Sequence, residues 1–371
     1  MNKEFEKKER LYSLDALRGF DMLFIMGFAW WITSLCKFFP SSDAMVWMSS
    51  QMQHVEWHGL AFMDTIFPLF LFIAGISFPF SIAKQRAAGK TEKQIFYKII
   101  SRALILVLLG FVHNGIFKLD FGNIRFAQVL GRIGLAWMFS GLMFMKWKPK
   151  ILAVIAVVLL AGYWLLLWLI PGGPDTYSFE HNLAGAVDRV LLPGKLAYGN
   201  NHFDPEGLLG IIPSIVTAML GMFTGQFIRI SNDKLSGNRK TLYMMGAAAA
   251  LLLIGLVWNE VFPFNKKLWS SSFVCAVGAY SLFLFALFYY IIDVKGYQRW
   301  TFFFRVIGMN SITIYITQRF INFDYTSRFF LGGIAGKCPE LWANLIHATG
   351  YIIVCWLFLY FLYKMKIFIK V

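Results

Sequence analysis

The chain has 371 residues, of which 58% are hydrophobic and 15% are charged, whereas soluble domains average about 45 to 50% apolar and about 25% charged residues. This composition excludes an ordinary soluble protein, and the long unbroken apolar blocks predict a single polytopic membrane domain over residues 1–371. A formal net charge of +15 can indicate binding to nucleic acid, but in a membrane protein positive residues also gather in the cytoplasmic loops. The positions of the positive residues must therefore be examined first.

About ten stretches are long and apolar enough to cross a membrane as helices, which takes roughly 17 to 25 residues each. They lie near residues 16–39, 59–83, 101–117, 127–145, 151–170, 207–230, 241–258, 270–292, 302–322 and 341–363. The sequence therefore predicts an all-α polytopic membrane protein.

The distribution of Lys and Arg predicts how these helices are oriented. Of the 35 Lys and Arg residues, 22 lie in the two termini and in alternate connections, nine lie in the other connections, and four lie inside spans. Because positive residues are retained on the cytoplasmic side, both termini are expected to be cytoplasmic. Topology then explains most of the charge, and no nucleic acid partner is expected.

Two connections on the opposite side are long, residues 40–58 and 171–206. Loops of this length are usually functional or disordered, and the aromatic, glycine and paired-charge content of these two argues against disorder. We therefore expect both loops to be functional. The sequence contains no N-x-S/T glycosylation site, which favours a bacterial inner membrane over a eukaryotic secretory compartment.

The four cysteines are far apart in the chain, with no C-x-x-C pair and no spacing that suits zinc. The sequence also lacks dinucleotide-binding, P-loop, zinc-protease and nucleophile-elbow motifs. We therefore expect neither a metal nor a redox cofactor.

Ionisable residues within membrane spans are costly and mark candidate functional sites. Arg18, Arg102 and Arg305 lie near the predicted cytoplasmic ends of three different helices. Guanidinium groups that converge at one membrane face would suit the phosphate groups of a polyanion. The alternative is that these arginines reach out to lipid headgroups or pair with Asp15 and Asp21.

The opposite side carries carboxylates, basic residues and indoles. The candidates there are His54, Glu56, Trp57, Asp64, Arg132, Asp204, Glu206, Lys267 and Trp269. Such a mixture suits a polar ring such as a sugar, because carboxylates accept hydrogen bonds from hydroxyl groups and indoles offer an apolar face. His54 is a candidate general base, with Asp64 or Glu56 orienting its ring. The alternative is that these groups are simply solvated at the membrane surface.

Polar residues at bilayer depth form a third set. Asn310 and Ser311 lie near the middle of the predicted span 302–322, where amide and hydroxyl groups must find partners or line a polar passage. Gly221 and Gly225 form a G-x-x-x-G pattern in the span 207–230, which favours a close helix contact and says little about function.

Seven motifs occur in order along the chain. They are RLYSLDALRGFDML (10–23), HVEWHGLAFMDTIFPLFLFIAG (54–75), VLGRIGLAW (129–137), FDPEGLLGIIPSIVTAMLG (203–221), NKKLWSSSFV (265–274), DVKG (293–296) and GMNSITIYI (308–316). Together they closely resemble the transmembrane acyltransferase family of the heparan-α-glucosaminide N-acetyltransferases. The resemblance runs over essentially the whole chain from about residue 10 onward.

This resemblance implies a function. In the family, cytosolic acetyl-CoA is the donor, and the acceptor is the amine of a terminal glucosamine, as in heparan sulfate, across the membrane. The active-site histidine stands in an H-x-x-W-x-G-L motif ahead of a D-x-x-F-P span, which corresponds to His54, Trp57 and Asp64 here. The resemblance also implies a homodimer among membrane lipids.

The resemblance further implies roles for the inner residues. Arg18, Arg102 and Arg305 would hold the CoA phosphates, and Asn310 and Ser311 would line the path of the pantetheine arm. The outer polar set would hold the sugar.

Two matters of chemistry stay open. His54 would either take a proton from the amine or form an acetyl-histidine intermediate. The chain also departs from the family at Ala29, because the lysosomal enzyme has an asparagine there that is thought to assist catalysis. Another donor must replace that asparagine, or the chemistry differs.

Two other classes of function remain. An amino-sugar transporter, which moves N-acetylglucosamine or muropeptide sugars without acyl transfer, would also need buried charges in a ten-helix protein. A scaffold or lipid-binding protein would not need paired polar residues at both membrane faces. Binding of CoA separates the classes, since a sugar carrier has no reason to bind CoA.

Overall fold

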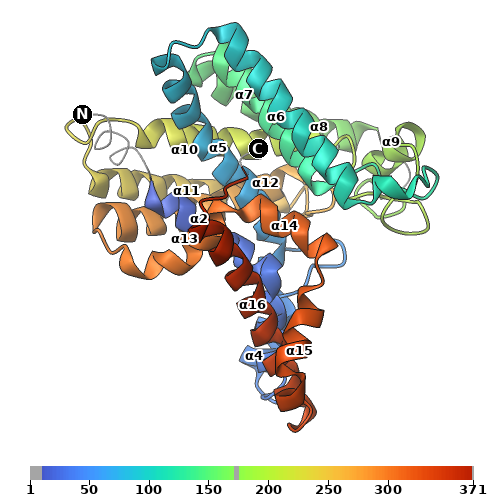
Figure 1. The fold of residues 1–371 in the computed structure, drawn as a ribbon. Coiled ribbons are helices and arrows are strands. Elements are labelled where there is room, and N and C mark those ends of the chain that lie inside the picture. Colours follow the sequence, from blue (N-terminus) through green and yellow to red (C-terminus); the bar gives the residue numbers. More distant parts are fainter. Residues whose placement is uncertain (1–10, 171–174, 370–371) are drawn as a thin grey trace. The chain divides into compact units, whose positions relative to one another are not determined.

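The computed structural model describes residues 11–170 and 175–369. The chain is 72% helical, with no strand among the described residues, which confirms the predicted all-α class (Figure 1). The basic N-terminal segment 1–10, residues 171–174 of the loop 171–206, and residues 370–371 lie outside the described residues.

The contacts within the chain divide it into two compact units. Of the described residues, unit 1 contains 11–54, 61–66 and 284–369, and unit 2 contains 55–60 and 67–283. The long helices α5 and α12 each begin in one unit and end in the other.

Unit 1 is built from helices near both ends of the sequence. They are α2 (Tyr12–Leu23), η1 (Phe24–Phe28), α3 (Ala29–Cys36), α4 (Asp43–Gln51), η3 (Tyr289–Val294), η4 (Arg299–Thr301), α13 (Phe302–Met309), α14 (Ser311–Phe320), α15 (Phe323–Ala335) and α16 (Glu340–Lys364). The labels η1 and η3 denote π-helical turns, and η4 is a 3₁₀ turn.

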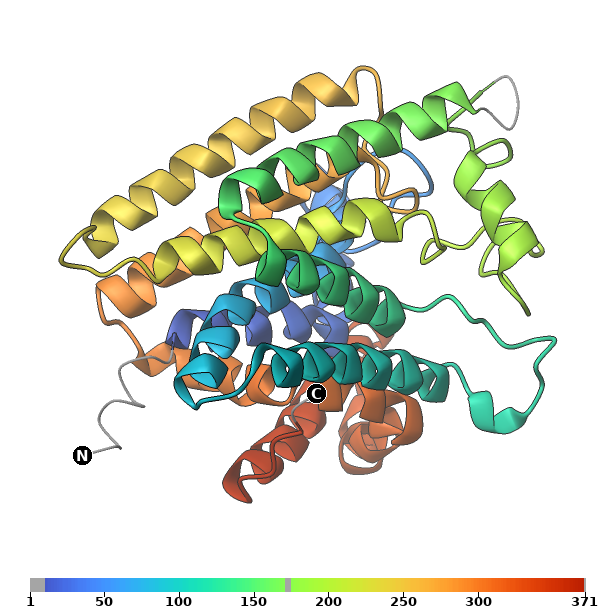
Figure 2. The same cartoon turned by 90° about the horizontal axis from the view of Figure 1, so that it is seen from above.

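Unit 2 is built from the middle of the sequence. It contains most of α5 (Phe62–Ala87), α6 (Glu92–His113), η2 (Ile116–Lys118), α7 (Val129–Lys146), α8 (Pro149–Leu169), α9 (Leu183–Leu191), α10 (Ile211–Ile228), α11 (Gly237–Asn259) and most of α12 (Ser271–Phe288). Helices α6 and α7 run side by side (Figures 1 and 2).

Nine helices in the described part of the chain are long and apolar enough to cross a membrane. They match nine of the ten predicted spans, so the chain is a polytopic membrane protein. The prediction for 101–117 began too late, because α6 starts at Glu92. Thr91 and Gln94 each accept the other's backbone N–H with their side chains, and this capping box starts the helix within its polar segment.

The remaining predicted span, 302–322, is two short helices. Asn310 separates α13 from α14 and has φ −129° and ψ 33°, which is not helical. The amide side chain of asparagine competes for backbone partners and weakens a helix interior. A membrane helix can be interrupted only where other groups satisfy the freed backbone, so this break marks a polar position inside unit 1.

Close glycine contacts hold the helices of each unit together. In unit 1, a Cβ on Gly19 of α2 would lie 1.8 Å from the carbonyl oxygen of Phe304 in α13. In unit 2, Cβ atoms on Gly221 and Gly225 of α10 would lie 2.1 and 2.3 Å from backbone oxygens of α5. The predicted close contact of the G-x-x-x-G pattern is thus confirmed, because no larger side chain fits at these crossings.

Asp293 explains one of the motifs structurally. Its two carboxylate oxygens accept the backbone N–H groups of Tyr12 and Ser13 at 3.2 and 3.3 Å. The first N–H groups of a helix have no acceptor within the helix. Asp293 supplies the acceptors for two of these groups at the start of α2. The DVKG motif therefore stabilises the helix that carries Arg18.

Candidate active site

His54 is hydrogen-bonded in unit 1 to Asp64, one of the two carboxylates predicted to orient its ring. His54 Nδ1 lies 2.8 Å from Asp64 Oδ1, and 51% of the histidine side chain is exposed against 1% of the aspartate. Asp64 is the third residue of α5, and its other oxygen accepts the backbone N–H of Ala61 at 3.1 Å. Acidic residues bond in this way at the third position of helices, so the start of α5 fixes the carboxylate.

The pair determines which nitrogen of His54 can accept a proton. A carboxylate only accepts hydrogen bonds, so Nδ1 carries the hydrogen that it donates to Asp64. The lone pair is then on Nε2, and the buried charge of Asp64 stabilises the imidazolium that forms when Nε2 is protonated. This arrangement can perform general base catalysis.

The chain around His54 is anchored on the side of α4 as well. The side-chain oxygen of Gln51, the last residue of α4, accepts the backbone N–H of Phe62, the first residue of α5, at 3.0 Å. This bond joins the end of one helix to the start of the next. His54 therefore lies in a short connection whose two ends, Gln51 and Phe62, are hydrogen-bonded to each other.

The segment after His54 is attached to a second motif in unit 2. Gly59 donates its N–H to the carbonyl of Phe264 at 2.8 Å, and Lys267 Nζ donates to the carbonyl of Glu56. Gly59 has φ +124°, a conformation that side chains rarely adopt, which explains the glycine of the motif. Lys267 Nζ also lies 4.6 Å from the ring centre of Tyr198. Glu56 itself is exposed.

Trp57 lies in an aromatic cluster of unit 2. Its Nε1 donates to the carbonyl of Tyr177 at 2.7 Å, and the rings of Phe179 and Phe203 meet its ring edge-on at 5.2 Å each. Lys267 Nζ lies 5.9 Å from the ring centre of Trp57. The structure thus brings together two of the predicted sugar-binding residues, an indole and an ammonium group.

His58 is the second histidine of the motif and has a different environment. The side-chain nitrogen of Asn265 lies 3.4 Å from its Nδ1. Burial lowers the pKa of His58, and the charge of Asp175 offsets this only in part. The environment of His58 thus differs from that of His54, which is hydrogen-bonded to the buried carboxylate of Asp64.

Asp204 and Glu206 form ion pairs with Arg125 in unit 2, a residue that the sequence did not single out. The guanidinium of Arg125 donates to both oxygens of Asp204, at 2.7 and 2.6 Å, and to Glu206. Burial acts to lower the pKa of Arg125, but pairing with the two carboxylates raises it overall. Asp204 also accepts the N–H groups of Ala197 and Glu206, so it holds this loop in place.

Arg132 and Trp269, the other predicted sugar-binding residues, are buried at 2% and 1% exposure. Arg132 donates to the carbonyl of Gly207 at 2.9 Å, and its guanidinium carbon lies 5.2 Å from the ring centre of Trp269. Asp188 accepts the N–H of Leu208 at 2.9 Å, and burial raises its pKa to about 6. Arg132 and Asp188 thus hold residues 207 and 208, within the motif that contains Asp204.

Two of the predicted donor-side arginines lie on packed helices of unit 1. Gly19, which follows Arg18, contacts Phe304, which precedes Arg305. Arg18 lies 3.9 Å from Asp15, one of the partners considered for it, and the guanidinium of Arg305 stacks 4.1 Å above the ring of Tyr12.

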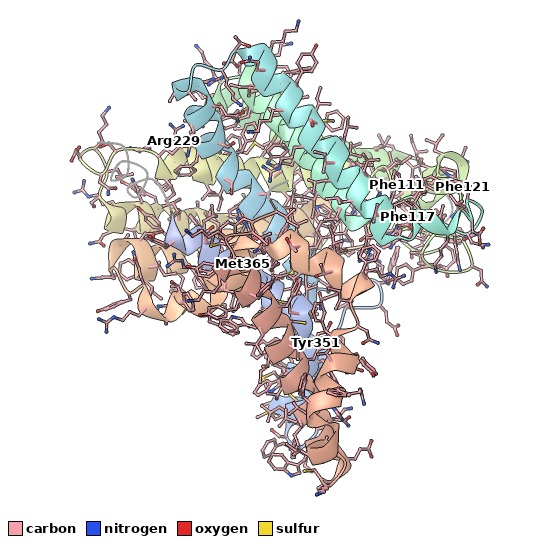
Figure 3. The ribbon with its side chains drawn as sticks, viewed as in Figure 1. Phe111, Phe117, Phe121, Arg229, Tyr351 and Met365 are labelled. Atoms are coloured by element: carbon pink, nitrogen blue, oxygen red, sulfur yellow. The ribbon has the colours of Figure 1, made fainter. Side chains whose placement is uncertain are left out.

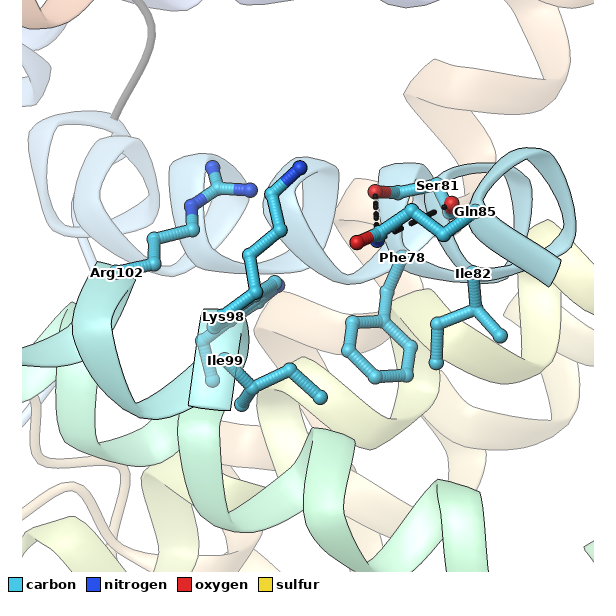
Figure 4. Close-up of a pocket in the computed structure, with 8 residues that line it drawn as sticks. Phe78, Ser81, Ile82, Gln85, Lys98, Ile99 and Arg102 are labelled. Atoms are coloured by element: carbon cyan, nitrogen blue, oxygen red, sulfur yellow. Dashed lines mark hydrogen bonds between the residues drawn. The ribbon is translucent and has the colours of Figure 1, made fainter. Parts of the chain in front are cut away.

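Arg102, the third predicted arginine, lines a pocket of unit 2 between α5, α6 and α7. The pocket is lined by Phe78, Ser81, Ile82, Gln85, Lys98, Ile99, Arg102 and Trp137. Figure 4 shows Lys98 and Arg102 of α6 pointing to the same side, while Gln85 bonds to Ser81 within α5. The guanidinium of Arg102 lies 4.5 Å from the ring centre of Trp137, a cation–π contact that holds the guanidinium in place. Two cationic side chains beside one pocket suit an anion.

Asn310 and Ser311 are buried in unit 1 at 1% and 5% exposure. The side-chain amide of Asn310 donates to the carbonyl of Ile367 at 3.0 Å, and its oxygen accepts the N–H of Ile369 at 3.3 Å. In this structure the amide of Asn310, which we predicted to line a passage, is therefore hydrogen-bonded to the residues that follow α16.

In the part of the chain that the structure describes, no group of three or more His, Cys, Asp or Glu residues could hold a metal ion. Sequence reasoning did not single out Arg125, which pairs with Asp204, or Asn265, which contacts His58, and both lie in loops. Arg125 was counted only as a loop charge, and its pairing with Asp204 joins residues 79 positions apart. Nothing in the local sequence predicts such a pairing.

Comparisons with known proteins support the resemblance seen in the motifs. The chain matches no family model. It is 27% identical over 382 residues to the heparan-α-glucosaminide N-acetyltransferase of Mus musculus, covering 86% of this chain and 56% of that protein. It is 26% identical over 419 residues to that of Homo sapiens, covering 98% of this chain and 60% of that protein. The chain thus spans less than two thirds of these relatives, and its resemblance to them is confirmed over most of its own length.

Proposed function

We propose that this membrane protein is an N-acetyltransferase that moves an acetyl group from cytoplasmic acetyl-CoA to the amine of a glucosamine-type sugar on the other side of the membrane. The single observation that carries the proposal is the pair of half-exposed His54 with buried Asp64. The names of the similar proteins support the reaction and the sugar.

The chemistry follows from the pair. The amine nitrogen attacks the thioester carbonyl, and Nε2 of His54 takes the amine proton as the new C–N bond forms. The C–S bond breaks, and the CoA sulfur leaves with the electron pair and takes up a proton. Asp64 keeps Nδ1 protonated and stabilises the imidazolium. The pair also suits the alternative route, in which Nε2 attacks the thioester itself to form an acetyl-histidine.

The basic residues support a CoA donor. Lys98 and Arg102 line one pocket of unit 2, and Arg18 and Arg305 lie on adjoining helices of unit 1. Guanidinium groups bind phosphate with paired hydrogen bonds. In the proposal these residues bind the CoA phosphates, and Asn310 and Ser311 contact the pantetheine arm.

The acceptor side is proposed to lie on loops 40–58 and 171–206, outside the cytoplasm. Trp57 and Lys267 are the residues of unit 2 best suited to contact a sugar, because an indole face and an ammonium group adjoin there. Arg132, Asp204, Glu206 and Trp269 act mainly as their support. The bacterial inner membrane, both termini in the cytoplasm and a homodimer belong to the same proposal.

The discontinuous helix α13–α14 favours a second candidate, an amino-sugar transporter. Interrupted membrane helices commonly form the binding sites of transporters near the bilayer midplane, and Asn310 is buried at such a break. A transporter of this kind would bind N-acetylglucosamine and would not bind acetyl-CoA.

The test uses purified protein in detergent with acetyl-CoA and glucosamine. We expect N-acetylglucosamine to form, and His54→Ala to lower the rate by about 10²- to 10⁴-fold with an unchanged melting temperature. His181→Ala, which alters an exposed histidine that contacts Ser178, is the matched control and should keep full activity. If calorimetry detects binding of N-acetylglucosamine but no binding of acetyl-CoA, the proposed acetyltransferase function is wrong and the protein is a sugar transporter.

A further inference from the structure

The residues that follow α16 turn back toward the break between α13 and α14. Helix α16 ends at Lys364, and Lys366 has φ +57°, the left-handed conformation that reverses the chain after a helix. Ile367 then donates its N–H to the carbonyl of Leu362 at 2.9 Å. We call residues 366–369 the α16 tail; Figure 3 labels Met365, which precedes it.

The α16 tail is hydrogen-bonded to both polar atoms of the Asn310 amide. Asn310 Nδ2 donates to the carbonyl of Ile367 at 3.0 Å, and Asn310 Oδ1 accepts the N–H of Ile369 at 3.3 Å. Asn310 is 1% exposed. A ligand that needs the amide of Asn310 must therefore displace the tail.

The end of α16 and its tail contact both ends of α13. At the start of α13, the ring of Phe302 lies 5.8 Å from the ring of Tyr363, near the end of α16. Asn310, which directly follows the last residue of α13, donates to the tail. By the predicted topology this end of α16 is cytoplasmic, the side from which acetyl-CoA would enter.

Both isoleucines of the tail are exposed. Ile367 and Ile369 are 44% and 52% exposed, so their side chains add little buried surface. Lys366 adopts the left-handed conformation although it is not glycine, and this conformation costs free energy. That free energy is recovered if the tail leaves Asn310 and Lys366 takes another conformation. Such a segment can be displaced by a ligand that binds only the open state.

We propose that the α16 tail is an autoinhibitory latch. In the closed state it occupies Asn310 at the break between α13 and α14, and in the open state it leaves Asn310 to the acyl donor. The identity of the ligand rests on the proposed acetyltransferase function, whereas the latch itself rests on the two hydrogen bonds to Asn310.

The first experiment measures the latch without any substrate. Trypsin cleavage after Lys366 is followed by intact mass in the full chain and in two variants that weaken the latch. Asn310→Leu removes both hydrogen bonds, and Ile369→Pro removes the N–H that Asn310 accepts. Ile369→Leu keeps that N–H and is the matched control for the proline variant.

We expect cleavage after Lys366 to be about ten times faster in Asn310→Leu and in Ile369→Pro than in the full chain, and unchanged in Ile369→Leu. Cleavage after Lys234, in the connection between α10 and α11, reports on the rest of the fold and should stay the same. Equal rates after Lys366 in all four proteins would overturn the latch.

The second experiment measures inhibition with acetyl-CoA as the probe. We expect saturating acetyl-CoA to speed cleavage after Lys366 in the full chain, and a chain that stops after Lys364 to bind acetyl-CoA several-fold more tightly. Equal affinities in the full and the shortened chain would overturn the inhibitory role. Absence of acetyl-CoA binding in both chains would overturn the proposed function, while the first experiment still decides the latch.

Discussion

In the His54–Asp64 pair, an exposed imidazole is hydrogen-bonded to a buried carboxylate. Asp64 is 1% exposed and His54 is 51% exposed, so the carboxylate loses its solvation while the imidazole stays reachable. A buried charge must be compensated by hydrogen bonds, and Asp64 obtains these from Ala61 and His54. The positive charge that His54 gains during the reaction is therefore stabilised more than it would be beside an exposed carboxylate.

Asp64→Asn tests this role of the pair. Asparagine can still accept the N–H of Ala61, but it carries no charge to stabilise the imidazolium. We expect the rate of acetyl transfer to fall by about 10²- to 10⁴-fold, with a changed pH profile. The melting temperature should change little, as measured by differential scanning fluorimetry.

The control for Asp64→Asn is Asp43→Asn, which makes the same change in the first turn of α4 at an exposed residue. It should leave both the rate and the pH profile as they are. A rate for Asp64→Asn close to that of the full-length parent would remove Asp64 from the mechanism.

Asp188 predicts a pH dependence of stability. Burial raises its pKa from 3.8 to about 6 in the folded protein, so the folded state binds more protons than the unfolded state between these values. The contribution of Asp188 is therefore complete below about pH 4 and is lost as the pH rises through about 6. A shift of about two units corresponds to roughly 3 kcal/mol.

Asp188→Asn isolates this effect, since its amide oxygen can still accept the N–H of Leu208. We expect the variant to melt higher than the parent at pH 7.5 and at the same temperature as the parent near pH 4. Thermal unfolding at both pH values measures the difference. A difference that is independent of pH would show that Asp188 is not the titrating group.

At the scale of elements, unit 1 contains two helical stretches that are interrupted. Besides the break at Asn310, the span Tyr12–Cys36 contains the π-helical turn η1, in which Gly27 has φ +107°. Gln318 of α14 donates to the hydroxyl of Tyr351 at 2.7 Å and to the carbonyl of Ile25 in η1 at 3.5 Å. Neighbouring helices thus satisfy the freed backbone, as they must inside a membrane; Figure 3 labels Tyr351 on α16.

The contact of α2 with α13 depends on glycine. A Cβ at Gly19 would lie 1.8 Å from a backbone oxygen of α13, and backbone cannot move aside without separating the helices. We expect Gly19→Ala to destabilise the protein by roughly 1–3 kcal/mol or more. The measurement is the melting temperature in detergent.

Gly246→Ala in α11 is the matched control, because nothing lies within 4 Å of the added Cβ there. Alanine favours helices over glycine by up to about 1 kcal/mol, so this variant should be as stable as the parent or more so. Equal destabilisation by both substitutions would contradict the packing argument.

At the scale of the whole molecule, the topology is the main prediction. Lys90 lies between α5 and α6, and Lys195 lies between α9 and α10, and both are exposed. In a Cys338→Ser background, a membrane-impermeant maleimide applied to intact cells should label Lys195→Cys. Lys90→Cys should be labelled only after the cells are opened, because the positive-inside rule puts that connection in the cytoplasm. The reverse pattern would invert the proposed direction of transfer.

The sequence predicted the class of the protein and most of its helices, because the hydrophobic requirement of a membrane applies to each span separately. It placed nine of ten spans, and it named Asp64 and Glu56 as alternative partners of His54. Of these, Asp64, ten residues from His54, is hydrogen-bonded to it. It did not predict the interruption of 302–322, since the apolar composition of that stretch is the same for a straight and for a broken helix.

By itself, then, the sequence determined the all-α membrane class, nine of the membrane helices, the candidate base His54 and the resemblance to a family of acetyltransferases. Only the tertiary structure decided which polar residues are already engaged. Asp204 and Glu206 looked available for a sugar, but Arg125 from another loop pairs with both, and Asn310 looked available for a donor, but the α16 tail occupies it. The physical reason is that a polar side chain has few hydrogen-bonding positions, and contacts between distant parts of the chain decide what fills them.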